Sequence, residues 1–538
     1  MKRASTLLIF GCSLLLGKTP FAGETGLSDR QRATHLLDRL AFGARPGEVE
    51  KLSSQGPAGI ARWIERQLHP QTIADDAMEA KLAKLPAIRM NAKELLENFR
   101  RPEDVALEMG VKKEDFQKDE ELKKKVREKI GQEKLPEEIN RELAAQRLIR
   151  AVESRRELQE VLVDFWMNHF NIDISKGEER WLLPDFESRV IRPRIFGKFS
   201  ELLKATTRSP AMLFYLDNHL SESPLDYAGK NGPVPKKNGR GLNENYAREI
   251  LELHTLGVEG GYDQTDVTEL ARILTGWSIE DPHKSPEFKF KERIHDRGGK
   301  SFLGSRFDPG HGIDEGERAI DLIVSHPSTA RLIAFKLCKH FVSDRPPEKL
   351  VIRVAKKFTE TQGDLLAVYR TLFNSPEFWA KESFRAKVKS PQEFTLSAIR
   401  AMGGEIDLKT ELPKSLAAMG EEPYRCAPPT GYKDDAETWV NPGAMVSRLD
   451  FAVRLAMNHV DGTYVQLPRL GRTPGGTRGL LQQVSTRLLH ANLGKTTWEV
   501  VQHEFINDQS LLGEGEISPL FLAKASGLIL GSPEFQRR

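Results

Sequence analysis

Residues 241–278 read GLNENYAREILELHTLGVEGGYDQTDVTELARILTGWS, and this stretch concentrates acids, amides, arginine and histidine in a helix-forming segment. Asn243 is suited to cap a helix, and Glu244 then lies in the first turn, where the helix dipole favours a negative charge. Gly257 is suited to end the helix because glycine adopts the left-handed conformation without strain. The stretch therefore predicts an amphipathic helix as the centre of a helical protein.

A second helix follows almost at once. Asp263 or Thr265 is suited to cap it, and we expect it to extend over Thr265–Trp277. The Gly260-Gly261 pair favours a tight turn between the two helices. The segment is therefore expected to form a helical hairpin.

The first predicted helix has a polar and an apolar side when its residues are placed at steps of about 100°. The polar side carries Glu244, Asn245, Arg248, Glu249 and Glu252. His254 falls on the apolar side, away from Glu249 and Glu252, so one straight helix cannot bring all three to one metal ion.

Two interpretations of the polar side stay open. The first is a solvated stripe in which Arg248 pairs with Glu244 and Glu252 at spacing four, with His254 as a core histidine. The second is a functional site. It is favoured by Asn243 and Asn245. Asparagine is a poor helix former, and a helix face that is only solvated would be more stable with Lys, Gln or Ala at these positions.

The segment NENYAREILELHTLG followed by GGYDQTDVTELARILTGW resembles the hallmark of a bacterial family known as domain of unknown function 1800. The resemblance extends from about residue 35 to residue 454 through further motifs in the expected order: HLLDRLAFGARPGEVE, DFWMNHFNI, SPAMLFYLDN, HDRGGKSFLG, HPSTARLIAFKLCKHFVSDRPP, SPEF and PPTGY. It implies a secreted bacterial protein, often encoded beside an uncharacterised exported protein that resembles the alkaline phosphatase and sulfatase superfamily. It implies no established activity and no cofactor.

The N-terminus predicts export. Residues 1–23 have a basic start, a short apolar run and small residues before Glu24, as in a signal peptide, so we expect a periplasmic or secreted protein. A lipoprotein signal ending before Cys12 is less favoured, because the apolar run would stop early. Only Cys338 and Cys426 then remain, and either one disulfide or two buried thiols fits.

Composition limits the class of partner and the architecture. The chain of 538 residues has a net charge of +3, with 80 Lys and Arg against 77 Asp and Glu, which argues against nucleic-acid binding. No apolar run beyond the N-terminus is long enough to span a membrane. The periodicity predicts a mainly α, large multi-helix globular fold with long loops and one small β-hairpin around Phe288–Phe290 and Gly298-Gly299.

The chain is expected to divide into three regions after the signal peptide. Residues 24–150 form an N-terminal helical region with a Lys- and Glu-rich insertion, residues 151–345 form a central helical core with the polar motif, and residues 346–538 form a C-terminal helical region. The insertion, from Ala77 to Leu148, is interpreted as surface helices or a mobile segment without chemistry.

A second candidate segment is Leu158–Phe170, whose apolar residues circle the whole helix axis and predict burial on all sides. Asp164 and Asn168 lie along one line within it, and His169 stands at its end. Buried acids and amides need partners, so a structural polar network is the first interpretation. The second is that His169 joins His254 or Glu249 from another helix.

Three functions remain open from the sequence. The first is an exported hydrolase acting on an envelope or extracellular polymer, with Glu249, His254 and His169 as acid or base groups. Its substrate-binding candidates are Asn243, Glu244, Asn245, Arg248, Glu252, Asn168, Asp217 and Asn218. The second is a non-enzymatic envelope binding or assembly protein that partners the co-encoded exported protein. The third is a metal- or haem-binding protein that uses His169 and His254, with the metal and cofactor unassigned.

Overall fold

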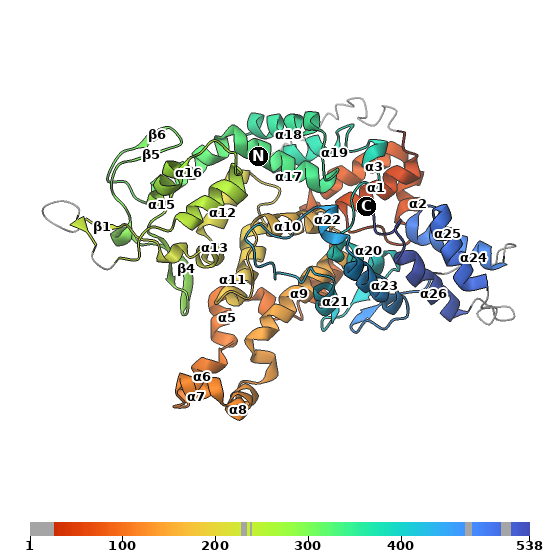
Figure 1. The fold of residues 1–538 in the computed structure, drawn as a ribbon, viewed down its shortest axis with the longest axis horizontal. Helices are drawn as coiled ribbons and strands as arrows, with labels where there is room; N and C mark the ends of the chain where they lie inside the picture. The colour runs from red at the N-terminus through yellow and green to blue at the C-terminus, as the bar shows by residue number, and fades with distance from the viewer. Residues whose placement is uncertain (1–25, 228–233, 237–238, 469–475, 507–517) are drawn as a thin grey trace, which may run out of the picture.

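The computed structural model describes residues 26–227, 234–236, 239–468, 476–506 and 518–538, and it is built mainly from helices (Figure 1). The mainly α fold is therefore confirmed. The predicted signal peptide, residues 1–23, lies outside the described residues. In the part of the chain that is described, no helix is long and apolar enough to cross a membrane.

The N-terminal helices pack as a small group. They are α1 (Asp29–Leu40), α2 (Glu48–Ser54) and α3 (Gly56–Gln67). Ser28 begins α1 through a capping box with Gln31, in which each side chain accepts from the other residue's backbone N–H. Gly47 has a φ of 84° just before α2, a left-handed conformation that glycine adopts without strain.

The charged insertion is helical. It consists of α4 (Asp76–Leu82), α5 (Ala92–Asn98), α6 (Pro102–Glu108), α7 (Lys113–Lys118), α8 (Glu120–Ile130) and α9 (Pro136–Glu153). Figure 1 shows α6, α7 and α8 projecting from the body as an arm. The arm has its own small core of Val105, Ala106, Phe116 and Val126. The prediction of surface helices is therefore confirmed for the arm, whereas α9 is largely buried in the body.

The central region contains two π-helices. Its helices are α10 (Glu157–His169), α11 (Glu179–Asp185), η4 (Phe186–Ile191, π), α12 (Phe199–Arg208), α13 (Pro210–Tyr215), α14 (Glu244–Glu249), η6 (Ile250–Thr255, π) and α15 (Gln264–Ile273). The second helix of the central segment was predicted to extend to Trp277, but α15 ends at Ile273. Trp277 does not belong to α15 but begins a strand, since its ring is buried between Gly316 and Phe288, a residue of the neighbouring strand.

The strands form two-stranded antiparallel sheets. They are β1 (Leu225–Asp226) with β2 (Val234–Pro235), β3 (Trp277–Asp281) with β4 (Ser285–Phe290), β5 (Lys300–Phe302) with β6 (Ser305–Phe307), and β7 (Glu405–Ile406) with β8 (Thr463–Tyr464). The predicted hairpin was wrong in its pairing. Phe290 pairs with Trp277 rather than with the segment after Gly299, because apolar side chains of β3 and β4 pack together.

The remaining helices complete the body. They are α16 (Ile313–Ser325), α17 (Pro327–Phe341), α18 (Glu348–Glu360), α19 (Leu365–Phe373), α20 (Pro391–Ala401), α21 (Leu412–Ala418), α22 (Ala436–Trp439), α23 (Pro442–Ala456), α24 (Gly476–Leu489), α25 (Lys495–Ile506) and α26 (Pro519–Leu530). Short 3-10 turns cover Pro70–Thr72, Ala87–Arg89, Gln132–Lys134, Asn218–Leu220, Glu292–Ile294 and Lys381–Ser383.

The main hydrophobic core is one cluster of buried side chains that extends from Ala33 to Phe535. The division of the chain into three regions stays a prediction. Cys338 and Cys426 are both buried and unpaired.

Candidate functional site

The central segment begins and ends as expected. The Asn243 side chain accepts from the Tyr246 N–H at 3.0 Å and so caps α14. Gly257 ends the helical stretch with a φ of 86°. Asp263 caps α15 by accepting from the Asp266 N–H at 3.0 Å. The two-helix hairpin is therefore confirmed, with α14 and α15 packed against each other.

The first helix of the segment is not straight. After Glu249 it continues as the π-helix η6, in which the Leu256 N–H donates to the Leu251 carbonyl at 2.7 Å. This bond spans five residues instead of four, so it rotates the residues that follow relative to a regular helix. The predicted angle about the helix axis between His254 and the two glutamates was that of a straight helix. It therefore does not apply to this segment.

His169 and His254 meet, although they belong to different helices. The His169 Nε2 lies 3.1 Å from the His254 carbonyl oxygen, and the two ring centroids are 6.0 Å apart. Lys336 of α17 completes the group: its Nζ lies 3.1 Å from the His169 Nδ1 and 3.2 Å from the Leu253 carbonyl oxygen. We call His169, His254 and Lys336 the imidazole–lysine cluster.

Burial fixes the charge of this cluster. It lowers the pKa of His254 to about 3, and Lys336 adds to the effect. Burial also holds the pKa of His169 well below its usual range, reinforced by Lys336 and His254. Both rings are therefore neutral at ordinary pH. His169 then donates from Nε2 and accepts at Nδ1, the tautomer that the surrounding groups require.

The predicted carboxylates do not join the imidazoles. Glu244 accepts from Gln264 Nε2 at 2.8 Å and from Thr268 Oγ1 at 3.0 Å, both on α15. Arg248 donates to Gln264 Oε1 at 2.7 Å. The expected spacing-four ion pairs of Arg248 are wrong for the described residues, because the polar face packs against α15 instead of facing water alone.

Glu249 and Glu252 are half-buried, whereas Asn245 is exposed. Burial raises the pKa of Glu249, the charge of Glu252 raises it further, and Arg248 lowers it. Within the described chain, neither carboxylate forms an ion pair or hydrogen bond with His169 or His254. A role for Glu249 as an acid or base stays a prediction.

The amides predicted to bind substrate hold loops and helices together. Asn168 accepts from the Tyr432 N–H at 2.8 Å and donates to the Tyr432 carbonyl at 2.9 Å. Asn218 is fully buried and donates to the carbonyls of Leu274 and Trp277. Asn243 also donates to the Leu216 carbonyl at 2.6 Å.

The two acids near these amides are held by cations. Asp217 lies at the surface with a φ of 59° and forms an ion pair with Lys176 at 2.9 Å. Asp164 is half-buried, pairs with Arg147 and accepts from Gln392 Nε2 at 2.6 Å. The structural network expected around Asp164 is confirmed by these partners.

A histidine–aspartate pair was not predicted from the sequence. Its histidine lies one turn after Lys336 on α17, and its aspartate lies in a loop. His340 Nδ1 lies 3.1 Å from Asp434 Oδ2, and Asp434 Oδ1 lies 2.9 Å from the buried Lys387 Nζ. Burial raises the pKa of Asp434, but the cations, led by Lys387, outweigh it and hold that pKa well below its usual range. We call His340 and Asp434 the dyad.

The dyad adjoins the imidazole–lysine cluster. The Phe165 ring lies between them, 6.4 Å from the His169 centroid and 5.3 Å from the His340 centroid. Lys336 and His340 are four positions apart in the sequence, which places them on one face of α17. The acid that orients His340 was not visible, because Asp434 belongs to a loop 94 positions away.

Comparison with known proteins shows the family of the chain. A family model described as "Protein of unknown function (DUF1800)" matches residues 35–537. The chain belongs to this family. No curated protein and no solved structure is detectably similar to it. For this DUF1800 member the residues themselves are therefore the evidence for function.

For a metal ion, no set of three ligands is present in the described part of this DUF1800 chain, and the haem interpretation stays a prediction. There, no group of three or more His, Cys, Asp or Glu side chains is arranged to hold a metal ion. His169 uses both ring nitrogens in hydrogen bonds, to the His254 carbonyl and to Lys336.

Proposed function

We propose that the chain is an exported hydrolase acting on a polymer of the cell envelope or its surroundings, with His340 as the general base. The observation that supports this most is the dyad. Asp434 accepts from Nδ1 and thereby leaves Nε2 of His340 as the basic nitrogen. Nε2 is buried and has no hydrogen-bond partner among the described protein groups.

The surroundings of His340 fit proton transfer. Asp434 is one-third exposed, so water reaches the carboxylate side of the dyad, and proton transfer at the buried Nε2 requires a local opening beside Asp434. Lys336 lies four residues earlier on α17 and therefore on the same face as His340. Its ammonium supplies positive charge for the oxyanion that forms when water adds to a carbonyl carbon of the substrate and gives a proton to His340. The oxyanion then expels the leaving group, which takes that proton back from His340. His169 would position Lys336 and would not itself transfer protons.

The test is release of soluble fragments from purified peptidoglycan sacculi and from extracellular polysaccharide. His340→Gln is expected to lower the rate by about 100-fold or more, the usual contribution of a general base. His311→Gln is the control, because His311 is exposed and, among the described residues, pairs only with Asp314. No release by the unchanged protein, or full activity of His340→Gln, would refute the hydrolase.

A second candidate is a non-enzymatic envelope protein that binds the co-encoded exported protein of the alkaline phosphatase and sulfatase type. It is favoured by the amides Asn168, Asn218 and Asn243, which are used in internal hydrogen bonds. Co-purification of the two proteins from a periplasmic extract tests it, and the same fractionation tests the predicted export. Stoichiometric binding with no hydrolysis of either polymer would favour this candidate.

A further inference from the structure

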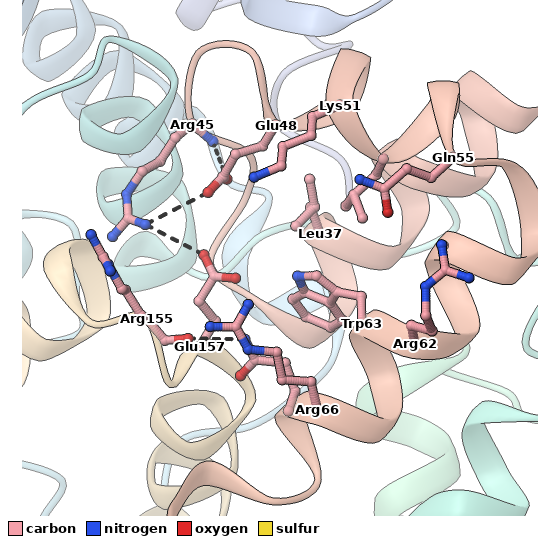
Figure 2. A pocket seen from close by; sticks show the side chains of 13 residues that line it. Leu37, Arg45, Glu48, Lys51, Gln55, Arg62, Trp63, Arg66, Arg155 and Glu157 are labelled. Carbon is pink, nitrogen blue, oxygen red and sulfur yellow. Dashed lines mark hydrogen bonds and ion pairs between the residues drawn. The ribbon is translucent and has the colours of Figure 1, made fainter. Parts of the chain in front are cut away.

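An open cavity of about 510 Å³ lies among α1, α2, α3 and the junction of α9 with α10, away from both polar groups described above. Figure 2 shows Leu37 and Trp63 in its middle, with Arg45, Glu48 and Lys51 on one side and Arg62 and Arg66 on the other. Its volume is within the range of small-molecule sites, about 300–1,000 Å³.

One wall of the cavity is a balanced ion cluster. Arg45 lies 3.6 Å from both Glu48 and Glu157, and Arg400 behind them pairs with Glu157 and lies 3.6 Å from Glu48. Two cations thus face two carboxylates. Burial raises the pKa of Glu157 although both arginines oppose it. This wall therefore contributes no net charge, and it fixes Arg45 and Glu48 in place.

The other charged groups around the cavity are all cations. Lys51, Arg62, Arg66 and Arg155 are exposed. None of these four forms an ion pair within the described chain, although all four lie around one cavity. Arg62 and Arg66 lie four residues apart on α3, a spacing at which like charges repel and destabilise a helix. The cavity therefore has an excess of about four positive charges with no internal counter-charge.

We infer that this cavity binds a saccharide that carries a carboxylate or a phosphate group. The four cations supply the charge complement of the acidic group, and arginine adds paired donors that match both anions. Trp63 offers a flat apolar surface for one face of a sugar ring. Glu48 and Gln55 at the edge offer acceptors for hydroxyl groups. A purely apolar ligand would leave the cations unmatched, and a bare anion would leave Trp63 unused.

The cavity is built to hold its shape. The Gln67 side chain donates to the Arg155 carbonyl at 2.9 Å and accepts from the Leu158 N–H at 3.3 Å, which joins α3 to the start of α10. Glu157 at the start of α10 and His169 at its end are twelve positions apart, about 18 Å along a helix. The inference does not depend on the hydrolase.

The test is calorimetric titration of the full chain with four probes: glucuronate, glucose 6-phosphate, glucose and inorganic phosphate. We expect at least one of the two acidic sugars to bind at least tenfold more tightly than both glucose and inorganic phosphate. The stronger of the two distinguishes a carboxylate from a phosphate ligand. We also expect the affinity to fall as salt rises, because exposed charges are screened.

Variants place the binding in the cavity. Arg62→Gln with Arg66→Gln should weaken binding of the preferred acidic sugar at least tenfold, and Trp63→Leu should weaken it without changing its salt dependence. The matched control is Arg297→Gln with Arg306→Gln, two exposed arginines far along the chain. The inference is overturned if neither acidic sugar binds at millimolar concentration, if inorganic phosphate binds as tightly, or if the control weakens binding equally. Thermal unfolding of each variant identifies any loss that comes from misfolding, and Arg62→Lys with Arg66→Lys should then retain binding.

Discussion

The His169 Nε2 lies 3.1 Å from the His254 carbonyl oxygen, and the two residues are 85 positions apart in the chain. The contact joins α10 to the π-helix of the central segment, and Lys336 joins α17 to both. The imidazole–lysine cluster therefore ties together three helices of the core. Because both rings are buried and neutral, their first effect is on stability.

Replacing His169 by Phe should destabilise the protein. The ring volume is roughly kept, but the His254 carbonyl and the Lys336 ammonium each lose a buried partner. The expected loss is about 1–3 kcal/mol for each unsatisfied group. Chemical unfolding followed by circular dichroism measures it, with the exposed His503→Gln as control, which should change stability by less than about 0.5 kcal/mol. Equal stability of both variants would contradict a structural role for His169.

Lys336 should make stability depend on alkaline pH. Burial lowers its pKa from 10.5 to about 8, so the unfolded chain binds its proton more tightly than the folded one between these values. The free energy of unfolding therefore rises with pH from about 8 to about 10.5. Lys336→Met should lack this rise. The stability of the variant relative to the unchanged protein should therefore be greater near pH 7 than near pH 10. Melting temperatures of both proteins from pH 7 to 10 check it, and parallel curves would contradict it.

The sequence predicted local features of the fold well. The caps at Asn243 and Asp263 and the end at Gly257 follow from the conformational preferences of single residues, and all three are confirmed. The π-helix was not predictable, because a bond that spans five residues is favoured here by packing and not by the local sequence. The pairing of Phe290 with Trp277 was missed for a similar reason: it depends on burial against α16.

The candidate site was predictable only in part. That His169 joins His254 or Glu249 from another helix was the second of two interpretations of the sequence, and the contact with His254 is present. Asp434 and Lys387 were missed because their neighbours in sequence give no sign of a shared partner. The cations around Trp63 were missed because they look like ordinary surface charges until α2 and α3 are folded together.

Asp434→Asn should destabilise the protein at neutral pH. It leaves the Lys387 ammonium, which is 1 % exposed, with Asp344 as its remaining carboxylate partner at 2.6 Å, so the loss should stay below about 3–5 kcal/mol, the cost of breaking a fully buried pair. The folded pKa of Asp434 is depressed, so its contribution is present above the unfolded value near 3.9 and lost as pH falls below it. The difference between the two proteins should therefore shrink below about pH 4. Adding Lys387→Met to the variant should restore part of the stability; no recovery would contradict the pairing.

Replacing a buried amide of the site should lower the stability of the protein, whereas replacing an exposed one should not. Asn218→Leu removes the Asn218 donor from the carbonyls of Leu274 and Trp277, and we expect a loss of about 1–3 kcal/mol, although the Leu274 carbonyl still accepts from the Trp277 N–H. Asn245→Ala, on an exposed position of α14, should change stability by less than about 0.5 kcal/mol. Unfolding curves compare the two. If Asn245→Ala instead abolished polymer hydrolysis with normal stability, its predicted binding role would be supported.

Gly431→Ala should release the loop that carries Asp434. Gly431 has a φ of 73°, and an added Cβ would lie 2.6 Å from the Asn168 Oδ1, with the Asn168 carbonyl closer still. Because Asn168 holds Tyr432 through two backbone hydrogen bonds, the alanine must displace that pairing. We expect faster cleavage of residues 424–439 by a protease, and a weaker dyad, since Asp434 follows two residues after Tyr432. Asn168→Ala should give the same cleavage pattern, whereas Gly420→Ala, at a φ of 93° with open space around its Cβ position, carries only the backbone strain. Equal cleavage in the Gly420 and Gly431 variants would show that strain alone, and not the Asn168 contact, controls the loop.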